Sequence, residues 1–466
     1  MAIDCLIFAT ASNQKPPTAM TNLLSFLPFT PTTEQANALR SIESFLDSDD
    51  HFLIVRGAAG TGKTSIMSAV TQYLASKSIV PVPLGPTGRA AKNLGRKMGL
   101  PARTMHSCFY TPQTDVEQAV VRLIRRANDC TTLQVFIADE SSMVSDRLDA
   151  SGDFVAANPL LADFVDFVRQ GHAQNKIIFV GDAYQLPPVG YGVHEEAPAL
   201  LASHLQQRYR LRGSTVELSE IKRQANGSPI LQVAHQLRQS METRRLAMPN
   251  YIGQLYRGDQ DAVRLYLERF EQGQHERVAI LSLSNSYRDK CNALIRKELG
   301  LTGCLAMNDT VVLTQTHMGQ HYVANGEVGV VKAVDSRRHR VADLEFVEAE
   351  IAFKDEHNKE FSILSLVLKN SLISKLTKEQ LKGLYASEMR ENKAFRESKD
   401  IRESRYLSAL QLNYGHALTV HKAQGSEWDT VIMNTSMKTL DLRFLYTGIT
   451  RARRELFTNG AHRYAA

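Results

Sequence analysis

The sequence predicts an α/β protein in which two lobes are built on parallel β-sheets and the second lobe carries a β-rich insertion. Three observations predict this class. Between residues 51 and 185, short apolar runs alternate with helical segments, and each run ends in a polar or glycine-rich turn. A second series of this kind begins at 277–286 and resumes at 430–436. Between its two parts, residues 304–370 alternate apolar and polar residues with a period of two, as half-solvated strands do.

The length and composition are those of an ordinary globular protein. The chain has 466 residues, of which 43% are hydrophobic and 22% charged, and about 150 residues per domain would give about three domains. This composition excludes collagen-like, mucin-like and wholly disordered proteins. The net charge of +6 is compatible with a nucleic-acid partner but does not demonstrate one.

The five cysteines indicate a reducing compartment. They are odd in number, widely spaced and never arranged as Cys-x-x-Cys, so neither a disulfide framework nor a zinc ribbon is encoded. Residues 5–11 resemble a signal peptide only in being apolar, because the run is short and an aspartate precedes it. No run reaches the ~18 apolar residues of a membrane helix. We therefore expect a cytoplasmic protein without a membrane partner.

The first apolar run, residues 51–55, leads into a phosphate-binding motif. The pattern Gly-x-x-x-x-Gly-Lys-Thr is formed by Gly57, Ala58, Ala59, Gly60, Thr61, Gly62, Lys63 and Thr64. The helix predicted after it has an apolar face made of Ile66, Ala69, Val70, Tyr73 and Leu74. A strand, this loop and a helix in succession are typical of a P-loop. Its backbone N–H groups would hold phosphate oxygens, Lys63 would reach the β- and γ-phosphates, and Thr64 would ligate Mg²⁺.

Acidic and amide side chains follow two further predicted strands of the same lobe. Asp139 and Glu140 end the apolar run at 133–138, and a Gly-Asp-Ala-Tyr-Gln sequence that ends at Gln185 follows the next run. Ligands of open α/β folds collect at the carboxyl edge of the sheet, which would bring these residues to the P-loop. We predict that Asp139 binds Mg²⁺ and that Glu140 polarises the attacking water. Gln185 would sense the γ-phosphate or this water.

The two parts of the predicted insertion differ in character. In the β-rich part, Asn325-Gly326 signals a hairpin turn. The stretch 374–407 is densely charged, with a basic residue at every third position from Arg390 to Arg405 and acidic residues four positions after several of them. Steps of three residues drift around a helix and do not form a stripe. We therefore interpret this stretch as a solvated helix, in preference to a nucleic-acid-binding surface.

Taken in order along the chain, the motifs resemble those of superfamily 1 helicases, specifically the superfamily 1B group that includes RecD-like enzymes and the phage Dda helicase. The resemblance covers roughly residues 30–455. In the first half it rests on the P-loop and on the segments 32–39, 86–92, 104–107, 139–143 and 181–189. In the second half it rests on the segments 220–224, 283–289, 419–428 and 445–453.

The resemblance implies roles for further residues. Gln35 would read the adenine, and Glu427 would lie near the ribose. Arg223 and Arg451 would reach the γ-phosphate from the second lobe, where arginines stabilise the charge on the transferring phosphoryl group. The residues that would line a single strand, through its phosphates, are Thr87, Thr104, His106, Asn285, Thr419 and His421. For the two histidines, a structural role within the fold is the alternative.

The resemblance also implies a domain plan of two RecA-like lobes, a pin-like insertion and an SH3-like β insertion. The predicted parts are a poorly ordered N-terminal extension (1–29), a first lobe (30–215) with the pin at about 108–132, a second lobe (216–303 and 412–466), and a β-rich insertion with the charged helical segment (304–411). Phe109 and Tyr110 of the pin are candidates for stacking on bases. Buried aromatic residues are the alternative for both.

These expectations lead to an ATP-dependent DNA helicase that moves along single-stranded DNA from 5′ to 3′, with ATP and Mg²⁺ as cofactors and single-stranded DNA and duplex junctions as partners. An RNA helicase is an open alternative, because phosphate contacts do not distinguish DNA from RNA. A P-loop phosphotransferase acting on a small molecule would leave the motifs from Arg223 to Arg451 without purpose. A nucleic-acid-binding protein that has lost hydrolysis is disfavoured by the intact Lys63, Asp139 and Glu140.

Overall fold

Two units make up the part of the chain that the computed structural model describes. The described residues are 22–148, 154–192, 194–220, 228–243, 253–271, 277–318, 322–355, 357–436 and 441–460. The first unit holds the described residues within 1–111, 123–151 and 156–227, and the second unit holds those within 112–122, 152–155 and 228–466. In these described ranges, no helix is both long and apolar enough to cross a membrane.

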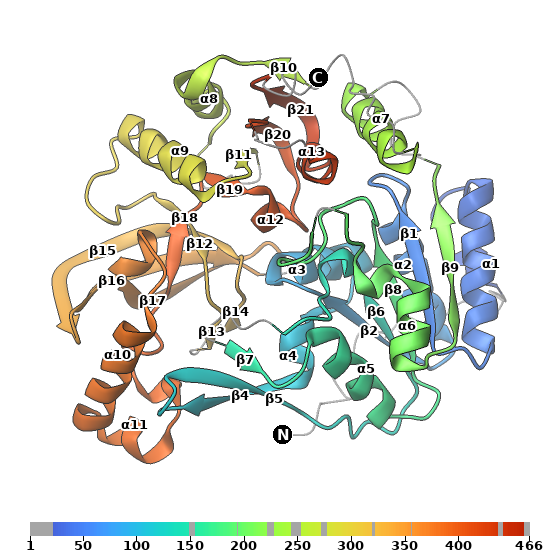
Figure 1. Cartoon of the computed structure of the whole chain (residues 1–466), viewed down its shortest axis with the longest axis horizontal. Helices are drawn as coiled ribbons and strands as arrows, with labels where there is room; N and C mark the ends of the chain where they lie inside the picture. Colours follow the sequence, from blue (N-terminus) through green and yellow to red (C-terminus); the bar gives the residue numbers. More distant parts are fainter. Residues whose placement is uncertain are drawn as a thin grey trace. The chain divides into compact units, whose positions relative to one another are not determined.

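The first unit is built on a six-stranded parallel sheet with the order β3-β2-β6-β8-β1-β9 (Figure 1). Its strands are β1 (Phe52–Gly57), β2 (Val80–Gly85), β3 (Arg103–Thr104), β6 (Gln134–Ala138), β8 (Lys176–Gly181) and β9 (Gly213–Leu218). The inner strands are almost wholly buried, which is why their sequences are nearly continuous apolar runs. The predicted series of strands between residues 51 and 185 is therefore confirmed.

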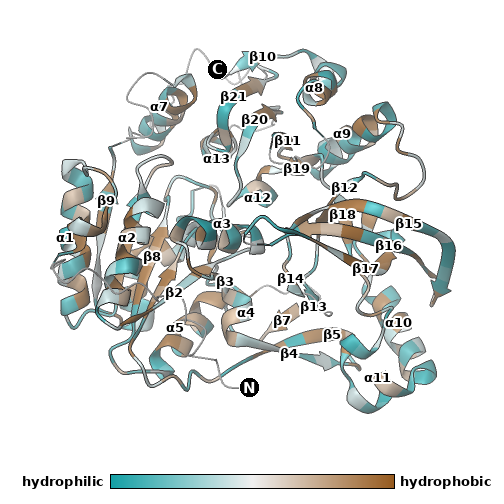
Figure 2. Cartoon of the chain, turned by 180° about the vertical axis from the view of Figure 1, so that it is seen from behind, coloured by the Kyte–Doolittle hydropathy of each residue, from teal (hydrophilic) through white to brown (hydrophobic). Residues whose placement is uncertain are grey.

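Helices cover both faces of this sheet. They are α1 (Thr33–Asp47), α2 (Lys63–Ser76), α3 (Gly88–Met98), α4 (Met105–Phe109), α5 (Leu160–Gln170) and α6 (Ala202–Tyr209). Alternate residues of β1 enter opposite cores: Leu53 and Val55 pack with α1, α2 and α3, whereas Phe52 packs with α4, α5 and α6. Figure 2 shows the inner strands β2 and β8 largely in the hydrophobic colour, whereas α1 carries both polar and hydrophobic residues.

Part of the predicted N-terminal extension packs against this unit. A short 3-10 helix, η1 (Leu23–Phe26), begins at the Asn22 cap, and Leu23 is fully buried in the core shared with α1 and α2. Leu23 therefore gives this stretch an apolar contact with the first unit, and the poor order of the extension stays a prediction. Residues 1–21 lie outside the described residues.

The second unit contains another parallel sheet, with the order β10-β21-β20-β11-β19. Its strands are β10 (Gln254–Leu255), β11 (Val278–Ser282), β19 (Ala417–Thr419), β20 (Trp428–Met433) and β21 (Ala452–Thr458). Its helices are α7 (Pro229–Thr243), α8 (Gly258–Leu267), α9 (Asn285–Glu298), α12 (Val420–Ala423) and α13 (Leu442–Ile449). The second series of strands and the predicted two-lobe α/β class are confirmed.

The β-rich insertion is a five-stranded antiparallel sheet with the order β17-β16-β15-β12-β18. Its strands are β12 (Thr310–Leu313), β15 (Val328–Val341), β16 (Leu344–Lys354), β17 (Glu360–Leu368) and β18 (Leu412–Tyr414). The turn at Asn325-Gly326 exists, with Gly326 at φ 89°, but it is not a hairpin turn. It joins β14 (Tyr322–Val323), which pairs with β13 (His317–Met318), to β15, which pairs with β12.

The charged stretch 374–407 folds differently from the predicted solvated helix. It forms α10 (Lys378–Glu391), α11 (Lys393–Ser398) and a 3-10 turn, η5 (Ile401–Glu403). Asn392 ends α10 and caps α11, where its side chain accepts a hydrogen bond from the backbone N–H of Phe395. Phe395 is fully buried and Tyr385 nearly so. The prediction of one solvated helix is therefore wrong, because apolar side chains between the charges form a small core.

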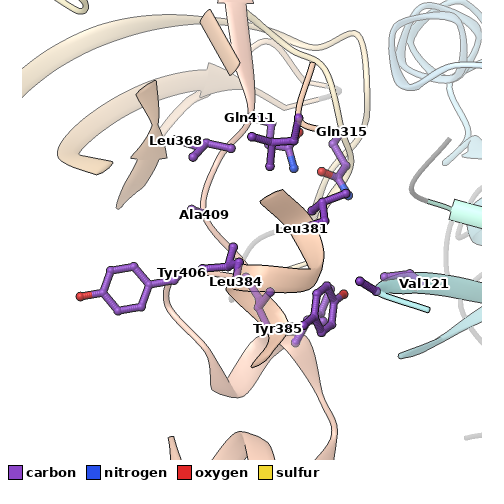
Figure 3. Close-up of a pocket in the computed structure, with 13 residues that line it drawn as sticks. Val121, Gln315, Leu368, Leu381, Leu384, Tyr385, Tyr406, Ala409 and Gln411 are labelled. Atoms are coloured by element: carbon purple, nitrogen blue, oxygen red, sulfur yellow. The ribbon is translucent and has the colours of Figure 1, made fainter. Parts of the chain in front are cut away.

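The partner of that core is the turn of a hairpin that lies much earlier in the chain, at Ala119. The predicted pin-like insertion contains β4 (Tyr110–Asp115) and β5 (Val120–Arg125), which form a three-stranded sheet with β7 (Phe154–Ala156). Ala119, in the turn, packs against Tyr385 and Phe395. Figure 3 shows Tyr385 of α10 pointing toward Val121, and both residues line one pocket.

The two aromatic residues at the start of the predicted pin are buried. Phe109 packs against Phe164 and Phe167, with ring centroids 5.9 and 5.5 Å away. Tyr110 donates a hydrogen bond to the Asp163 carboxylate at 2.8 Å. The interpretation of both residues as buried aromatics is confirmed, since neither presents a ring face for stacking on a base.

Candidate functional site

The loop between β1 and α2 depends on glycine at two positions. Gly60 and Gly62 have φ angles of 85° and 90°, in the left-handed region that glycine adopts without a steric cost. A Cβ atom on Gly62 would also lie 2.6 Å from Nε2 of Gln35. The local sequence therefore determines the course of this loop.

Lys63, the first residue of α2, folds back over the loop. Its Nζ atom donates hydrogen bonds to the carbonyl oxygens of Gly57 and Ala58, at 2.5 and 3.0 Å. Thr61 is fully buried, and its hydroxyl donates to the same Ala58 carbonyl at 2.9 Å. The loop thus holds a cation over its own backbone, where a bound phosphate would meet it.

Gln35 lies against the P-loop with both ends of its amide engaged. Oε1 accepts a hydrogen bond from the backbone N–H of Thr32 at 3.1 Å, in a capping box at the start of α1. Nε2 donates to the carbonyl oxygen of Thr61 at 2.9 Å. In this structure Gln35 connects the start of α1 to the P-loop, and its contact with adenine stays a prediction.

Asp139 and Glu140 lie at the carboxyl end of β6. Burial raises the pKa of the Asp139 carboxyl, while a hydrogen bond from the backbone N–H of Glu140 and the charge of Lys63 oppose this shift. Glu140 has φ 49° and ψ 39°, a left-handed conformation that costs roughly 1–3 kcal/mol for a residue with a side chain. Strain of this kind is concentrated at functional sites.

Gln185 follows β8, and its side chain is buried. The strand order β6-β8-β1 puts the ends of these parallel strands next to one another, and the three predicted motifs follow these ends. A Cβ atom on Gly181, the last residue of β8, would lie 3.3 Å from the backbone nitrogen of Ser142. The structure therefore brings the P-loop, Asp139-Glu140 and Gln185 to one edge of the sheet.

The structure describes two of the three residues predicted to act from the second unit. Arg451 is 4% exposed, and its guanidinium group donates to the carbonyl oxygens of Thr447 (3.0 Å) and Ser426 (3.4 Å). Glu427 is half-buried and lies 3.5 Å from Arg453. Arg223 falls outside the described residues. In this structure Arg451 is bonded within its own unit.

Three of the predicted single-strand contacts are helix caps. The hydroxyls of Thr87, Thr104 and Thr419 begin α3, α4 and α12, where each accepts a backbone N–H at 3.1–3.5 Å. The capping role of these threonines was not predicted, although a threonine before a predicted helix is the ordinary signal of a cap. A hydroxyl that accepts one bond still has its own proton to donate, so the cap leaves a phosphate contact possible.

The other three predicted contacts differ in exposure. Asn285, the first residue of α9, is exposed and accepts a hydrogen bond from Arg288 at 2.8 Å. His106 is exposed, with its ring 5.7 Å from that of Tyr110. His421 is half-buried, and burial lowers its pKa, which favours the neutral imidazole at pH 7.

Two cations that were not predicted, Arg288 and Lys422, lie close to these residues in the sequence. Desolvation, together with the charge of Arg288, lowers the pKa of Lys422 to about 8, although the residue as a whole is exposed. Arg288 is paired with Asp289 at 2.6 Å, and the Asp289 charge opposes the shift at Lys422. The signal was available, because both residues lie inside the segments that carry the resemblance, 283–289 and 419–428.

Comparison with known proteins agrees with the resemblance that the motifs indicated. A model described as an AAA domain matches residues 30–260, and one described as a UvrD-like helicase C-terminal domain matches residues 414–457. The ATP-dependent RecD2 DNA helicase of Deinococcus radiodurans is 28% identical over 447 residues, 92% of this chain and 49% of the relative. The ATP-dependent DNA helicase dda of Enterobacteria phage T4 is 24% identical over 308 residues, 64% of this chain and 63% of the relative. The chain therefore spans about half of the first relative and less than two thirds of the second.

Solved structures share the fold along the chain. A Pif1 helicase studied at forked double-stranded DNA matches with a TM-score of 0.51 and 18% identity, over 93% of this chain and 92% of that chain. A Bacteroides Pif1 bound to single-stranded DNA matches with a TM-score of 0.51 and 16% identity, over the same shares. The relatives agree with the resemblance that the motifs predicted, since the chain is similar to RecD2 and dda DNA helicases, and the solved structures show the same fold.

Proposed function

We propose that the chain hydrolyses ATP and uses the free energy to move along single-stranded DNA from 5′ to 3′ and to unwind duplexes. The observation that carries this proposal is the gathering of the P-loop, Asp139-Glu140 and Gln185 at one edge of a parallel sheet. A second unit that bears Arg451 supports a motor in preference to a small-molecule phosphotransferase. The named activities of the RecD2 and dda relatives point the same way.

The first unit supplies the groups that bind and cleave the triphosphate. Thr64 and Asp139 would hold Mg²⁺, which supplies charge neutralisation at the β- and γ-phosphates. The fit rests on Asp139, a desolvated carboxylate with a raised pKa of the kind that a neighbouring cation stabilises in its charged form. Lys63 would leave its carbonyl partners for the phosphates, because charged acceptors form stronger hydrogen bonds. Glu140 would then orient the water and take its proton.

The second unit would complete the site when the two units close on ATP. Arg451 would exchange the carbonyl oxygens of Thr447 and Ser426 for the γ-phosphate, and Arg223 would reach the same group. Together they would stabilise charge that develops in the transition state. Gln35 would contact the adenine and Glu427 would lie near the ribose. This arrangement makes turnover depend on closure, which couples hydrolysis to movement.

A single strand would be held through its phosphates. The cap threonines can each donate a hydroxyl proton, and Asn285, His106 and His421 add polar contacts. Arg288 and Lys422 add the positive charge that phosphate binding requires. Contacts of this kind are independent of base sequence and weaken steeply with salt. Both relatives are named as DNA helicases, which favours DNA over RNA as the nucleic acid that the chain binds.

The test is unwinding by the full chain, with ATP and Mg²⁺, of DNA duplexes that carry either a 5′ or a 3′ overhang. We expect unwinding from the 5′ overhang alone. Unwinding from the 3′ overhang alone would overturn the direction. A matched RNA duplex separates the alternatives, since faster unwinding of RNA than of DNA would make the protein an RNA helicase.

A further inference from the structure

The turn after β6 and the loop after β8 contain two buried polar atoms that lack partners. Ser142 is 1% exposed and Gln185 is 4% exposed. Among the residues that the structure describes, neither Oγ of Ser142 nor Oε1 of Gln185 has a hydrogen-bond partner. Leaving a buried polar atom unpaired destabilises a fold, and most such atoms are paired. Both atoms are therefore expected to gain a partner in another state of the protein.

The two residues lie on neighbouring turns of one unit. Ser142 is in the 3-10 turn η2 (Ser141–Met143), which follows β6, and β6 pairs with β8 in parallel. The end of β8 lies against this turn, as the 3.3 Å from a Cβ on Gly181 to the backbone nitrogen of Ser142 shows. The loop after β8 then turns back, because the backbone N–H of Gln185 donates to the carbonyl oxygen of Asp182 at 3.2 Å.

The two atoms are chemically complementary. A serine hydroxyl carries a proton to donate, whereas the oxygen of a glutamine amide can only accept. The amide group is planar, so a hydrogen bond to Oε1 also determines the direction in which the N–H donors of Nε2 point. A residue that holds Oε1 therefore controls where Gln185 directs its donors.

We propose that Ser142 is a positioning residue for ATP hydrolysis: with nucleotide bound, its hydroxyl donates to Oε1 of Gln185 and turns the Nε2 group toward the γ-phosphate or the attacking water. This inference rests on the proposed function. The strained Glu140 immediately precedes the same turn, so the hydrogen bond would tie the water-orienting carboxylate to the γ-phosphate sensor. Both groups would then reach their working positions together.

Ser141 provides a matched control. It lies in the same turn and is fully buried, but its hydroxyl donates to the carbonyl oxygen of Ala138 at 2.7 Å. Ser141→Ala removes the same atom from the neighbouring position without touching a partner of Gln185. Any general weakening of the turn is therefore common to Ser141→Ala and Ser142→Ala.

The experiment is a double-mutant cycle on steady-state ATP turnover by the full chain with single-stranded DNA. We expect Ser142→Ala to lower kcat about threefold to tenfold, the value of one hydrogen bond, and to leave KM for ATP within about twofold. In a Gln185→Ala background, Ser142→Ala should no longer lower kcat. Any decrease in kcat that Ser141→Ala causes in the wild-type background should remain in the Gln185→Ala background. In a Gln185→Glu background, which keeps an acceptor oxygen, the effect of Ser142→Ala should persist.

Two results would overturn the proposal. One is a kcat of Ser142→Ala equal to that of wild type, and the other is an undiminished effect of Ser142→Ala in the Gln185→Ala background. Both results are distinct from a failure of the proposed function, in which wild type itself would not hydrolyse ATP. A loss of turnover through unfolding would lower the melting temperature of Ser142→Ala more than that of Ser141→Ala, and this too would count against a positioning role.

Discussion

The P-loop and the charged stretch 374–407 both stand out in the sequence, but different contacts determine their structures. The P-loop depends on residues close to one another in the chain, whereas the charged stretch depends on a packing partner far away in the chain. In the P-loop, Gly60 and Gly62 permit the turn, and Lys63 bonds back to carbonyl groups five and six residues earlier. In the charged stretch, Tyr385 and Phe395 pack against Ala119 of the hairpin turn. The structure of a motif held by local contacts can thus be predicted residue by residue from the sequence. The spacing of charged residues does not predict packing between segments that are far apart in the chain.

The largest expected effects are in the P-loop unit, where single side chains carry chemistry. Lys63→Ala and Glu140→Gln should each lower ATP turnover by at least about a hundredfold. They should differ in binding, because Lys63 holds phosphate whereas Glu140 acts in the chemical step. Steady-state turnover and the binding of a fluorescent ATP analogue check this, with Lys77→Ala, an exposed lysine at the other end of α2, as control. Turnover by Glu140→Gln within threefold of wild type would remove Glu140 from its role.

In the charged stretch, the apolar side chains should matter more than the charges. Phe395→Ala should lower the free energy of unfolding of the second unit by about 3–5 kcal/mol, as expected for a large side chain removed from a core. Lys393→Ala, in the same helix but exposed, should leave it unchanged. Urea unfolding followed by fluorescence and circular dichroism measures both variants. Equal effects of the two substitutions would restore the interpretation of a solvated helix.

A buried histidine of the second unit should make its stability depend on pH. Burial lowers the pKa of His416 to about 3, so the unfolded chain, with a pKa near 6.5, takes up the proton first as the pH falls. The associated stability is present above about pH 6.5 and is lost toward pH 3, by about 2 kcal/mol at pH 5. His416→Gln keeps a partner for the Tyr266 hydroxyl, which lies 2.9 Å from His416 Nδ1, and should flatten the profile. Identical urea midpoints for wild type at pH 5 and pH 7 would contradict this account.

The smallest effect separates a helix cap from a phosphate contact. Thr87→Ala should lower stability by about 1 kcal/mol, because α3 loses its cap, and should also weaken binding of single-stranded DNA. Thr87→Asp should restore the cap but not the binding, since a carboxylate repels phosphate. Urea unfolding and fluorescence anisotropy with labelled oligonucleotide give the two readouts. Wild-type affinity in Thr87→Asp would limit Thr87 to capping.

The same contrast explains what could be predicted from the sequence. The apolar run 177–180 is β8, and Ile66, Val70 and Leu74 are buried as the helical spacing required. The gathering of Gln185 and the P-loop at one edge of the sheet followed from the general behaviour of parallel sheets, whereas the strand order is known from the structure. The core around Phe395 was missed because it depends on Ala119, a partner far away in the chain. The predicted hairpin at Asn325-Gly326 was wrong because β15 pairs with β12 and not with β14. The cations Arg288 and Lys422 were missed although both lie inside the segments that carry the resemblance.

The central claim is that binding of single-stranded DNA stimulates ATP hydrolysis in the first unit. Steady-state ATP turnover with and without single-stranded DNA tests this claim most directly. We expect the DNA to raise kcat of the wild-type chain strongly, and we expect Arg451→Ala to abolish this stimulation while the protein remains folded. Turnover that is the same with and without DNA, or stimulation that survives in Arg451→Ala, would contradict the claim that the second unit couples the strand to hydrolysis.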